Sequence, residues 1–275
     1  MEMERFTHLG RPLDLSYPTN VAIAALSVAT LVAVSLWQML YLHKEFMAAL
    51  LQGGQLAGVV FLTWALGREV DPDANHVAFL AIVPAIVLTV LVGTPDFSLL
   101  FLALLLLRVV NRSIGRPAKL VDSLLVLGLA SWLARSGAWY GLVSAAVAFL
   151  LDSVLVNPLP RHRWFGLAAV GVVWSQASIL GFSQSWPGIV TGIVAAGGIG
   201  LLLLLLFTPS LRSVGDLIAV PVNWKRLQAA RIVVFLLPLF AVWSKEMQGL
   251  AQMSPVLAVL AVAGCYRLIV WLKNR

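Results

Sequence analysis

Long apolar runs separated by short polar stretches constrain this chain more than any other feature of its sequence. A helix needs about 20 apolar residues to cross the hydrocarbon core of a bilayer, which is about 30 Å thick. Because two of the runs, 97–111 and 231–244, are short, it is open whether they span fully, and the sequence predicts eight to ten spans. The candidate spans are roughly 20–42, 46–66, 77–94, 97–111, 120–134, 138–156, 164–183, 187–207, 231–244 and 254–272.

The composition excludes an ordinary soluble domain. Only 11% of the 275 residues are charged and the mean hydropathy is +0.93, whereas about 25% of residues are charged in a typical soluble protein. The predicted fold class is therefore all-α, a polytopic transmembrane helical bundle. We expect a cytoplasmic N-terminal segment at 1–19 and one multi-span transmembrane domain at 20–275. The first apolar run is too long for a secretory signal, so it is read as a retained span.

The basic residues predict an orientation. If the N-terminus is cytoplasmic and all ten runs cross, every Lys and Arg among the 19 in the chain faces the cytoplasm except Lys44, Arg135 and Lys245. Cytoplasmic loops of membrane proteins carry such an excess. Both termini are then cytoplasmic, in a multi-pass protein of the plasma (inner) membrane.

The net charge of +7 is explained by the same loops, so no nucleic-acid partner is expected. The expected partners are the lipid bilayer and anionic lipid headgroups at the cytoplasmic loops. A membrane-protein partner or a second copy of the chain is left open. The glycine-rich run 187–200, with Gly188 and Gly192 in GxxxG spacing and Gly197, Gly198 and Gly200 after them, predicts a helix pressed against another backbone.

Five charged residues are predicted to take part in substrate binding or coupling. Asp122 and Asp152 lie inside apolar runs, as does Arg267 in the same leaflet, where it is expected to pair with one of the two acids. Ionisable groups within spans are costly and are often functional. Arg108 and Arg112 lie one helical turn apart, and arginine suits a phosphate group. The alternative is structural: acids at helix ends bonded to neighbouring arginines, and basic loops that only set orientation.

The stretch "GREVDPDANH" (67–76) concentrates acids in a chain that has few. Glu69, Asp71 and Asp73 are hard oxygen ligands of the type that binds Mg²⁺ together with a substrate phosphate. These three residues are the predicted metal site. The alternative is a solvated turn, because Pro72 ends a helix and Asp favours turns.

Three functions are compatible with these features. The leading one is a transporter or permease-like bundle for a small solute, with its polar face on the cytoplasmic side. In span count and orientation, though in no motif, the chain resembles the drug/metabolite transporter superfamily. A second is a non-catalytic membrane subunit or assembly factor, favoured by the very apolar runs.

The third function is a membrane-embedded transferase acting on a lipid (di)phosphate. Membrane prenyltransferases carry aspartate-rich motifs in cytoplasmic loops after their second and sixth helices. The acids at 69–73 follow the second run here, and Asp152 and Asn157 end the sixth, so the placement resembles that family, although its NxxxDxxxD motif is absent. Only this alternative requires a cofactor, Mg²⁺. No HExxH, GxSxG or Walker A motif is present, and whether the chain is an enzyme is left open.

Overall fold

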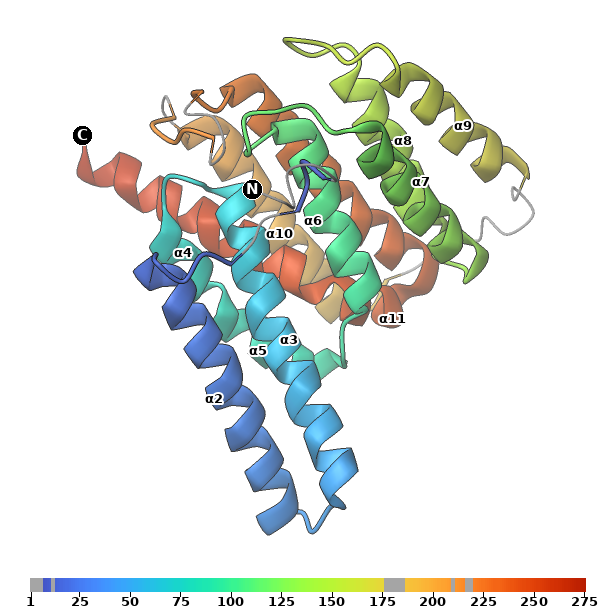
Figure 1. Ribbon diagram of the computed structural model, residues 1–275. Helices are drawn as coiled ribbons and strands as arrows, with labels where there is room; N and C mark the ends of the chain where they lie inside the picture. The colour runs from blue at the N-terminus through green and yellow to red at the C-terminus, as the bar shows by residue number, and fades with distance from the viewer. Residues whose placement is uncertain (1–6, 11–12, 176–185, 209–210, 216–219) are drawn as a thin grey trace.

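The chain is helical throughout the part that the structure, a computed structural model, describes. That part comprises residues 7–10, 13–175, 186–208, 211–215 and 220–275, and it contains no strand, only an isolated bridge between Val214 and Pro221. The all-α prediction is confirmed. The helices are α2 (Pro18–Leu40), α3 (Phe46–Val70), α4 (Asn75–Leu80), α5 (Ile82–Val92), α6 (Phe97–Asn111), α7 (Leu120–Arg135), α8 (Trp139–Asp152), α9 (His162–Ser175), α10 (Gly188–Phe207) and α11 (Trp224–Lys273) (Figure 1).

Several of these helices are long and apolar enough to cross a membrane. Five spans satisfy both criteria within the described residues: α2, α3, the α4–α5 pair, α10 and α11. The helices α6 and α8 are apolar but shorter, at 15 and 14 residues. The chain is thus compatible with an integral membrane protein. The end of the predicted span 164–183 lies outside the described residues.

The last helix, α11, is two helical segments joined by a tight reversal. At Glu246 the backbone has φ 48° and ψ −119°, which is not helical. A Cβ built on Gly249 would lie 2.0 Å from the carbonyl oxygen of Ala241. Residues eight apart in a continuous helix are separated by about 12 Å along the axis, so the two segments must fold back on each other.

Local sequence signals explain where several helices begin and end. Asp96 caps α6 by accepting from the amides of Ser98 and Leu99 at 2.9 and 3.1 Å, as side chains at this position commonly do. Pro72 disfavours the helical conformation at the residue before it, and α3 ends at Val70. The end of α6 is a left-handed turn at Arg112, with φ 52°.

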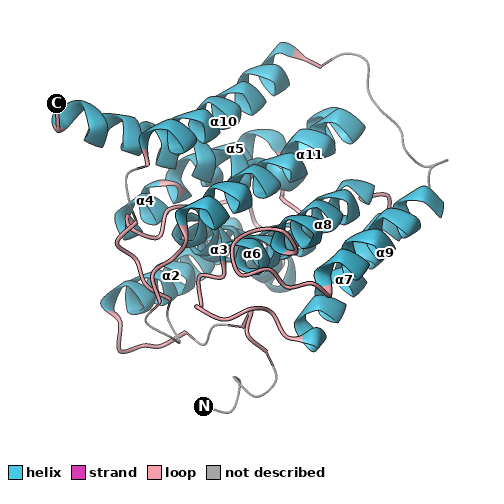
Figure 2. Ribbon diagram, turned by 90° about the horizontal axis from the view of Figure 1, so that it is seen from above, coloured by secondary structure: helices cyan, strands magenta, loops and turns pink. Residues whose placement is uncertain are grey.

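The centre of the bundle is α6, which packs against α3, α7, α8 and α11. Figure 2 shows it nearly end-on with these helices around it. Its residues 99, 100, 102–104, 106, 107, 109 and 110 are all buried. By contrast, the hairpin of α2 and α3 extends away from the rest (Figure 1).

The glycine-rich helix α10 packs most extensively against α11. The backbones of Gly200 and Gly264 meet there: a Cβ on Gly200 would lie 2.3 Å from the carbonyl oxygen of Leu260. The predicted close backbone approach is thus confirmed for Gly200. It is wrong for the GxxxG pair, because a Cβ on Gly188 or Gly192 would meet nothing within 4 Å.

The substitution Gly200→Ala should destabilise the protein, because its added methyl group collides with backbone that cannot move aside. We expect a loss of at least about 2 kcal/mol, in the range found for overpacked interiors, read as a lower thermal unfolding midpoint in detergent. The matched control is Gly192→Ala in the same helix, which has open space and should be neutral or slightly stabilising. Equal midpoints for the two variants would contradict the packing of α10 on α11.

Candidate functional site

Charged side chains that are far apart in the sequence meet at one end of the bundle. We call it the arginine end. Four carboxylates there, those of Glu69, Asp71, Asp122 and Asp152, are at most 2% exposed. A buried charge is costly unless it is paired and hydrogen-bonded, so the partners of these acids decide what the end can do. The arginines that define it are Arg108, Arg112, Arg226, Arg231 and Arg267.

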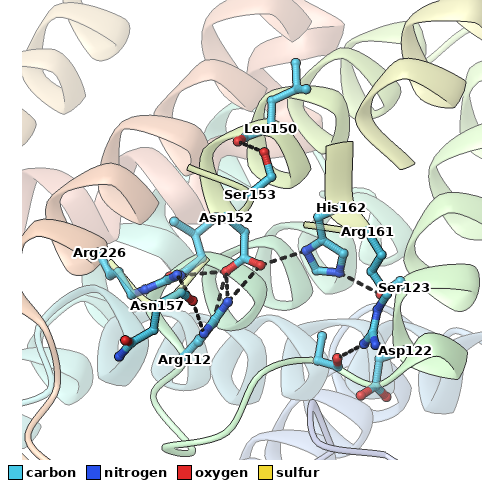
Figure 3. Close-up of polar contacts among 12 residues, drawn as sticks. Arg112, Asp122, Ser123, Leu150, Asp152, Ser153, Asn157, Arg161, His162 and Arg226 are labelled. Atoms are coloured by element: carbon cyan, nitrogen blue, oxygen red, sulfur yellow. Dashed lines mark hydrogen bonds and ion pairs between the residues drawn. The ribbon is translucent and has the colours of Figure 1, made fainter. Parts of the chain in front are cut away.

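Asp152, the last residue of α8, joins the ends of three other helices (Figure 3). Arg112 donates to it from Nε and Nη2, both at 3.0 Å, in the two-pronged geometry that arginine favours. Arg226 from the first turn of α11 donates at 2.6 Å. His162 at the start of α9 places Nδ1 2.8 Å from the second carboxylate oxygen, and its Nε2 lies 2.8 Å from the hydroxyl of Ser123 in α7.

The loop after α8 completes this cluster. Asn157, in the left-handed conformation with φ 55°, turns its carbonyl oxygen to Arg112 Nη1 at 2.8 Å and to Arg226 Nη2 at 3.2 Å. Arg226 also donates to the carbonyl oxygens of Val110 and Val156. Two cations thus surround one carboxylate, and backbone oxygens take up their remaining donors.

A second pair links α3 to the C-terminal part of α11. Arg267 donates from Nε to Asp71 at 2.7 Å and also from Nη2, and its Nη2 lies 3.8 Å from Asp73. The expectation that Arg267 pairs with Asp122 or Asp152 is therefore wrong. The reason is that Asp71 follows the end of α3 as a fully buried residue and faces α11 there.

The third contact joins α3, α6 and the N-terminal segment. Arg108 donates from Nε to Glu69 at 2.8 Å and from Nη1 to the carbonyl oxygen of Leu9 at 2.7 Å. The other carboxylate oxygen of Glu69 accepts from Asn111 at 3.1 Å. Leu9 itself is buried, so residues 7–10 are part of the packed structure.

Asp122 holds the same N-terminal segment. Its carboxylate accepts from the hydroxyl of Thr7, from the amide of His8 at 2.9 Å and from the amide of Lys119 at 2.8 Å. The Lys119 bond also fixes the first turn of α7, where an acid is favourable. The ring of His8 reaches the carbonyl oxygen of Pro117 at 2.8 Å.

The three acids predicted to bind a metal do not converge. Glu69 and Asp71 are paired with different arginines, and Asp73 accepts from the amides of Arg212 and Ser213. Within the described residues, no group of three or more His, Cys, Asp or Glu is arranged to hold a metal ion. The geometry therefore gives no support to the Mg²⁺ site, which remains a prediction from the sequence.

A cavity of about 980 Å³ lies beside the arginine end. It is bordered by the N-terminal segment, α2, α3, α6 and α7. Its polar end includes two of the contacts above, Glu69–Arg108 and Asp122, and its walls are apolar. Among the wall residues are Phe61, Leu62, Phe101, Leu105, Leu125 and Leu129. A large apolar cavity with a few convergent polar groups is the usual form of a small-molecule site, so this is the candidate functional site.

Sequence reasoning missed three residues of the arginine end. Arg226 and Arg231 counted only as loop charges, and His162 was not singled out. Arg231 is fully buried and donates to the carbonyl oxygen of Val70 at 2.8 Å. The sequence did contain a signal for the burial of Arg231, because this residue begins the apolar run 231–244. Basic residues that only set orientation remain in water.

No protein-family model matches this sequence, and neither curated proteins nor solved structures give a match.

The substitution Asp152→Asn should be strongly destabilising, because it leaves Arg112 and Arg226 without their carboxylate in a buried position. Breaking a buried pair in this way costs about 3–5 kcal/mol. Thermal unfolding in detergent, followed by tryptophan fluorescence, measures the loss. Glu45→Gln, at an exposed acid, is the control and should leave the midpoint unchanged.

The double variant Asp152→Asn/Arg112→Gln tests the cause. Because it also removes one of the two stranded cations, it should recover part of the lost stability. If the free energies lost in the single variants Asp152→Asn and Arg112→Gln instead add up to the loss in the double variant, the two residues are not coupled, and the cluster is not held by charge.

Proposed function

We propose that the chain crosses the plasma membrane ten times with both termini in the cytoplasm. Support comes from the arginine end, where the four connections that the basic residues assign to the cytoplasm lie together. The opposite end carries the reversal at Glu246. There the indole N–H of Trp139 donates to the hydroxyl of Ser244 at 3.2 Å, and the hydroxyl of Tyr140 donates to the side-chain oxygen of Gln252 at 2.5 Å. Excess positive charge on one side of the membrane is the expected arrangement for cytoplasmic loops.

Single cysteines test this orientation in a Cys265→Ser background, which removes the one native thiol. A membrane-impermeant maleimide applied to intact cells should label His43→Cys and Ser136→Cys. It should label Asn274→Cys only after the membrane is opened. Labelling of Asn274→Cys in intact cells would contradict the cytoplasmic C-terminus. It would also place residue 274 on the same side as His43, which requires an odd number of crossings.

We further propose that the protein is a permease-like bundle that moves a small amphipathic solute. The single observation that carries this proposal is the cavity beside the arginine end, with charged groups at one end and apolar walls. A bundle whose helices enclose such a site can bind a solute that has both a polar group and an apolar body. The volume lies at the upper end of the roughly 300–1,000 Å³ typical of ligand sites.

Uptake into proteoliposomes tests the transport function. The probes are a panel of labelled amphipathic organic cations, anions and zwitterions, measured against protein-free liposomes. The transported probe should show saturable uptake that Leu105→Trp abolishes, because the larger ring fills the cavity. Leu124→Trp on the exposed face of α7, outside the cavity lining, should transport normally. Equal uptake by the two variants would reject the cavity as the transport site.

The second candidate is a non-catalytic membrane subunit. The observation that favours it is that both acids predicted to couple transport, Asp122 and Asp152, hold the fold together through several contacts. Under this function a second membrane protein should remain bound through purification in mild detergent, and no probe should be taken up. A monodisperse single chain with saturable uptake would reject it.

A further inference from the structure

The cavity repeats one pattern on three helices. Each of α3, α6 and α7 has an ionisable residue at the arginine end and an aromatic or leucine side chain two turns away. The pairs are Arg68 and Phe61, Arg108 and Phe101, and Asp122 and Leu129. Residues seven apart in a helix are separated by about 10 Å, so the cavity runs about that far from its charged end into its apolar part.

The exposed side chain of Phe101 marks the open side of this cavity. Its neighbours Leu100 and Leu102 are fully buried, but Phe101 is 48% exposed. It begins a stripe with Leu105 and Arg108 along α6, which lies between α3 and α7 in both Figure 1 and Figure 2. Among the described residues, the central helix of the bundle thus has one stripe, from Phe101 through Leu105 to Arg108, that is exposed or half-buried.

Both signs of charge are present at the polar end. Two guanidiniums, of Arg68 and Arg108, line it together with three carboxylates. Asp14 lies at the rim, linked to Arg68 through Asn20, which accepts from Arg68 at 3.1 Å and donates to the backbone oxygen of Asp14 at 2.8 Å. Hydrogen bonds from Ser16 hold the pKa of Asp14 below its usual value, so this carboxylate is anionic at neutral pH.

We infer that the cavity binds one zwitterionic phospholipid from the leaflet next to the arginine end. Its phosphate lies at Arg68 and Arg108, its ammonium group at Asp14, and one acyl chain along the stripe of α6 from Leu105 to Phe101. This inference rests on the proposed function and names the class of amphiphile that the same site takes.

Three features favour this occupant. Guanidiniums suit phosphate oxygens, and the excess of carboxylates over arginines in the lining disfavours a ligand with several negative charges. The depth of about 10 Å fits within one leaflet, which is half of a core about 30 Å thick. A partner helix would need a groove through the whole core, and here the described N-terminal residues 7, 9, 10, 13 and 14 line the cavity.

The test is a titration of the delipidated full chain in detergent, with bound lipid counted by native mass spectrometry. The probe is phosphatidylethanolamine with one palmitoyl and one oleoyl chain. Diacylglycerol with the same chains lacks the phosphate, and glycerophosphoethanolamine lacks the chains. Each should bind at least about tenfold more weakly, as expected for the loss of one charge-assisted contact or of the apolar part. Phosphatidylglycerol, which has no ammonium group, should also bind more weakly.

Variants locate the binding site. Arg68→Gln, Asp14→Asn and Leu105→Trp should each weaken the binding of phosphatidylethanolamine, Arg68→Gln by about tenfold or more. Their controls are Arg163→Gln, an exposed arginine outside the cavity lining, and Leu124→Trp. Unfolding midpoints show that each variant is folded.

Four results would overturn the inference. Diacylglycerol binding as tightly as the phospholipid would leave only an apolar groove, and equal binding of glycerophosphoethanolamine would make this a site for soluble phosphate esters. Equal binding of phosphatidylglycerol would reject the zwitterionic assignment, and unchanged binding by Arg68→Gln and Leu105→Trp would place the lipid elsewhere. Lipid binding without uptake of any probe would reject transport alone, whereas uptake by a chain that binds no phospholipid would reject only this inference.

Discussion

The arginine end depends on the carboxylate of Asp152. Arg112, Arg226 and His162 all converge on it, and they come from the ends of three different helices. The buried guanidinium of Arg226 and the half-buried one of Arg112 would repel each other without an anion between them. The carboxylate therefore fixes the relative positions of α6, α8, α9 and α11 where they leave the apolar region. Arg108, four residues before Arg112, donates instead to Glu69 of α3 and lines the charged end of the cavity.

The cavity and the exposed Phe101 beside it form an apolar surface. Exposure of this surface to water is unfavourable, whereas contact with lipid is not. Large contiguous apolar surfaces are rare on soluble monomers and mark sites of association with lipid or another protein. In a bilayer the acyl chains cover such a surface, so the bundle can leave one side of α6 open. The described helices cover the other sides of α6 with α3, α8 and α11. The open side follows from the number and order of the helices, which no single helix sequence encodes.

The sequence predicted the helices well because hydrophobic length is a local property. Eight of the ten apolar runs each overlap a separate helix or helix pair, although the end of the run 164–183 lies outside the described residues. The other two runs, 231–244 and 254–272, lie in the two segments of α11. The partners of the charged residues were predicted poorly, because they are set by contacts between distant positions. Asp71 and Arg267 are 196 residues apart. Nothing local to either residue distinguishes this pairing from the expected one with Asp122 or Asp152.

The two acids that the sequence singled out are not equivalent in the structure. The carboxylate of Asp152 lies between the guanidiniums of Arg112 and Arg226, and its loss would leave the buried Arg226 without an anion. The described partners of Asp122 are a hydroxyl and two backbone amides, so the loss of this carboxylate breaks hydrogen bonds without stranding a buried cation. Those bonds hold residues 7 and 8 at the polar end of the cavity. Of the two acids, Asp122 is thus the one whose replacement would release residues 7 and 8 while the contacts of Asp152 remain.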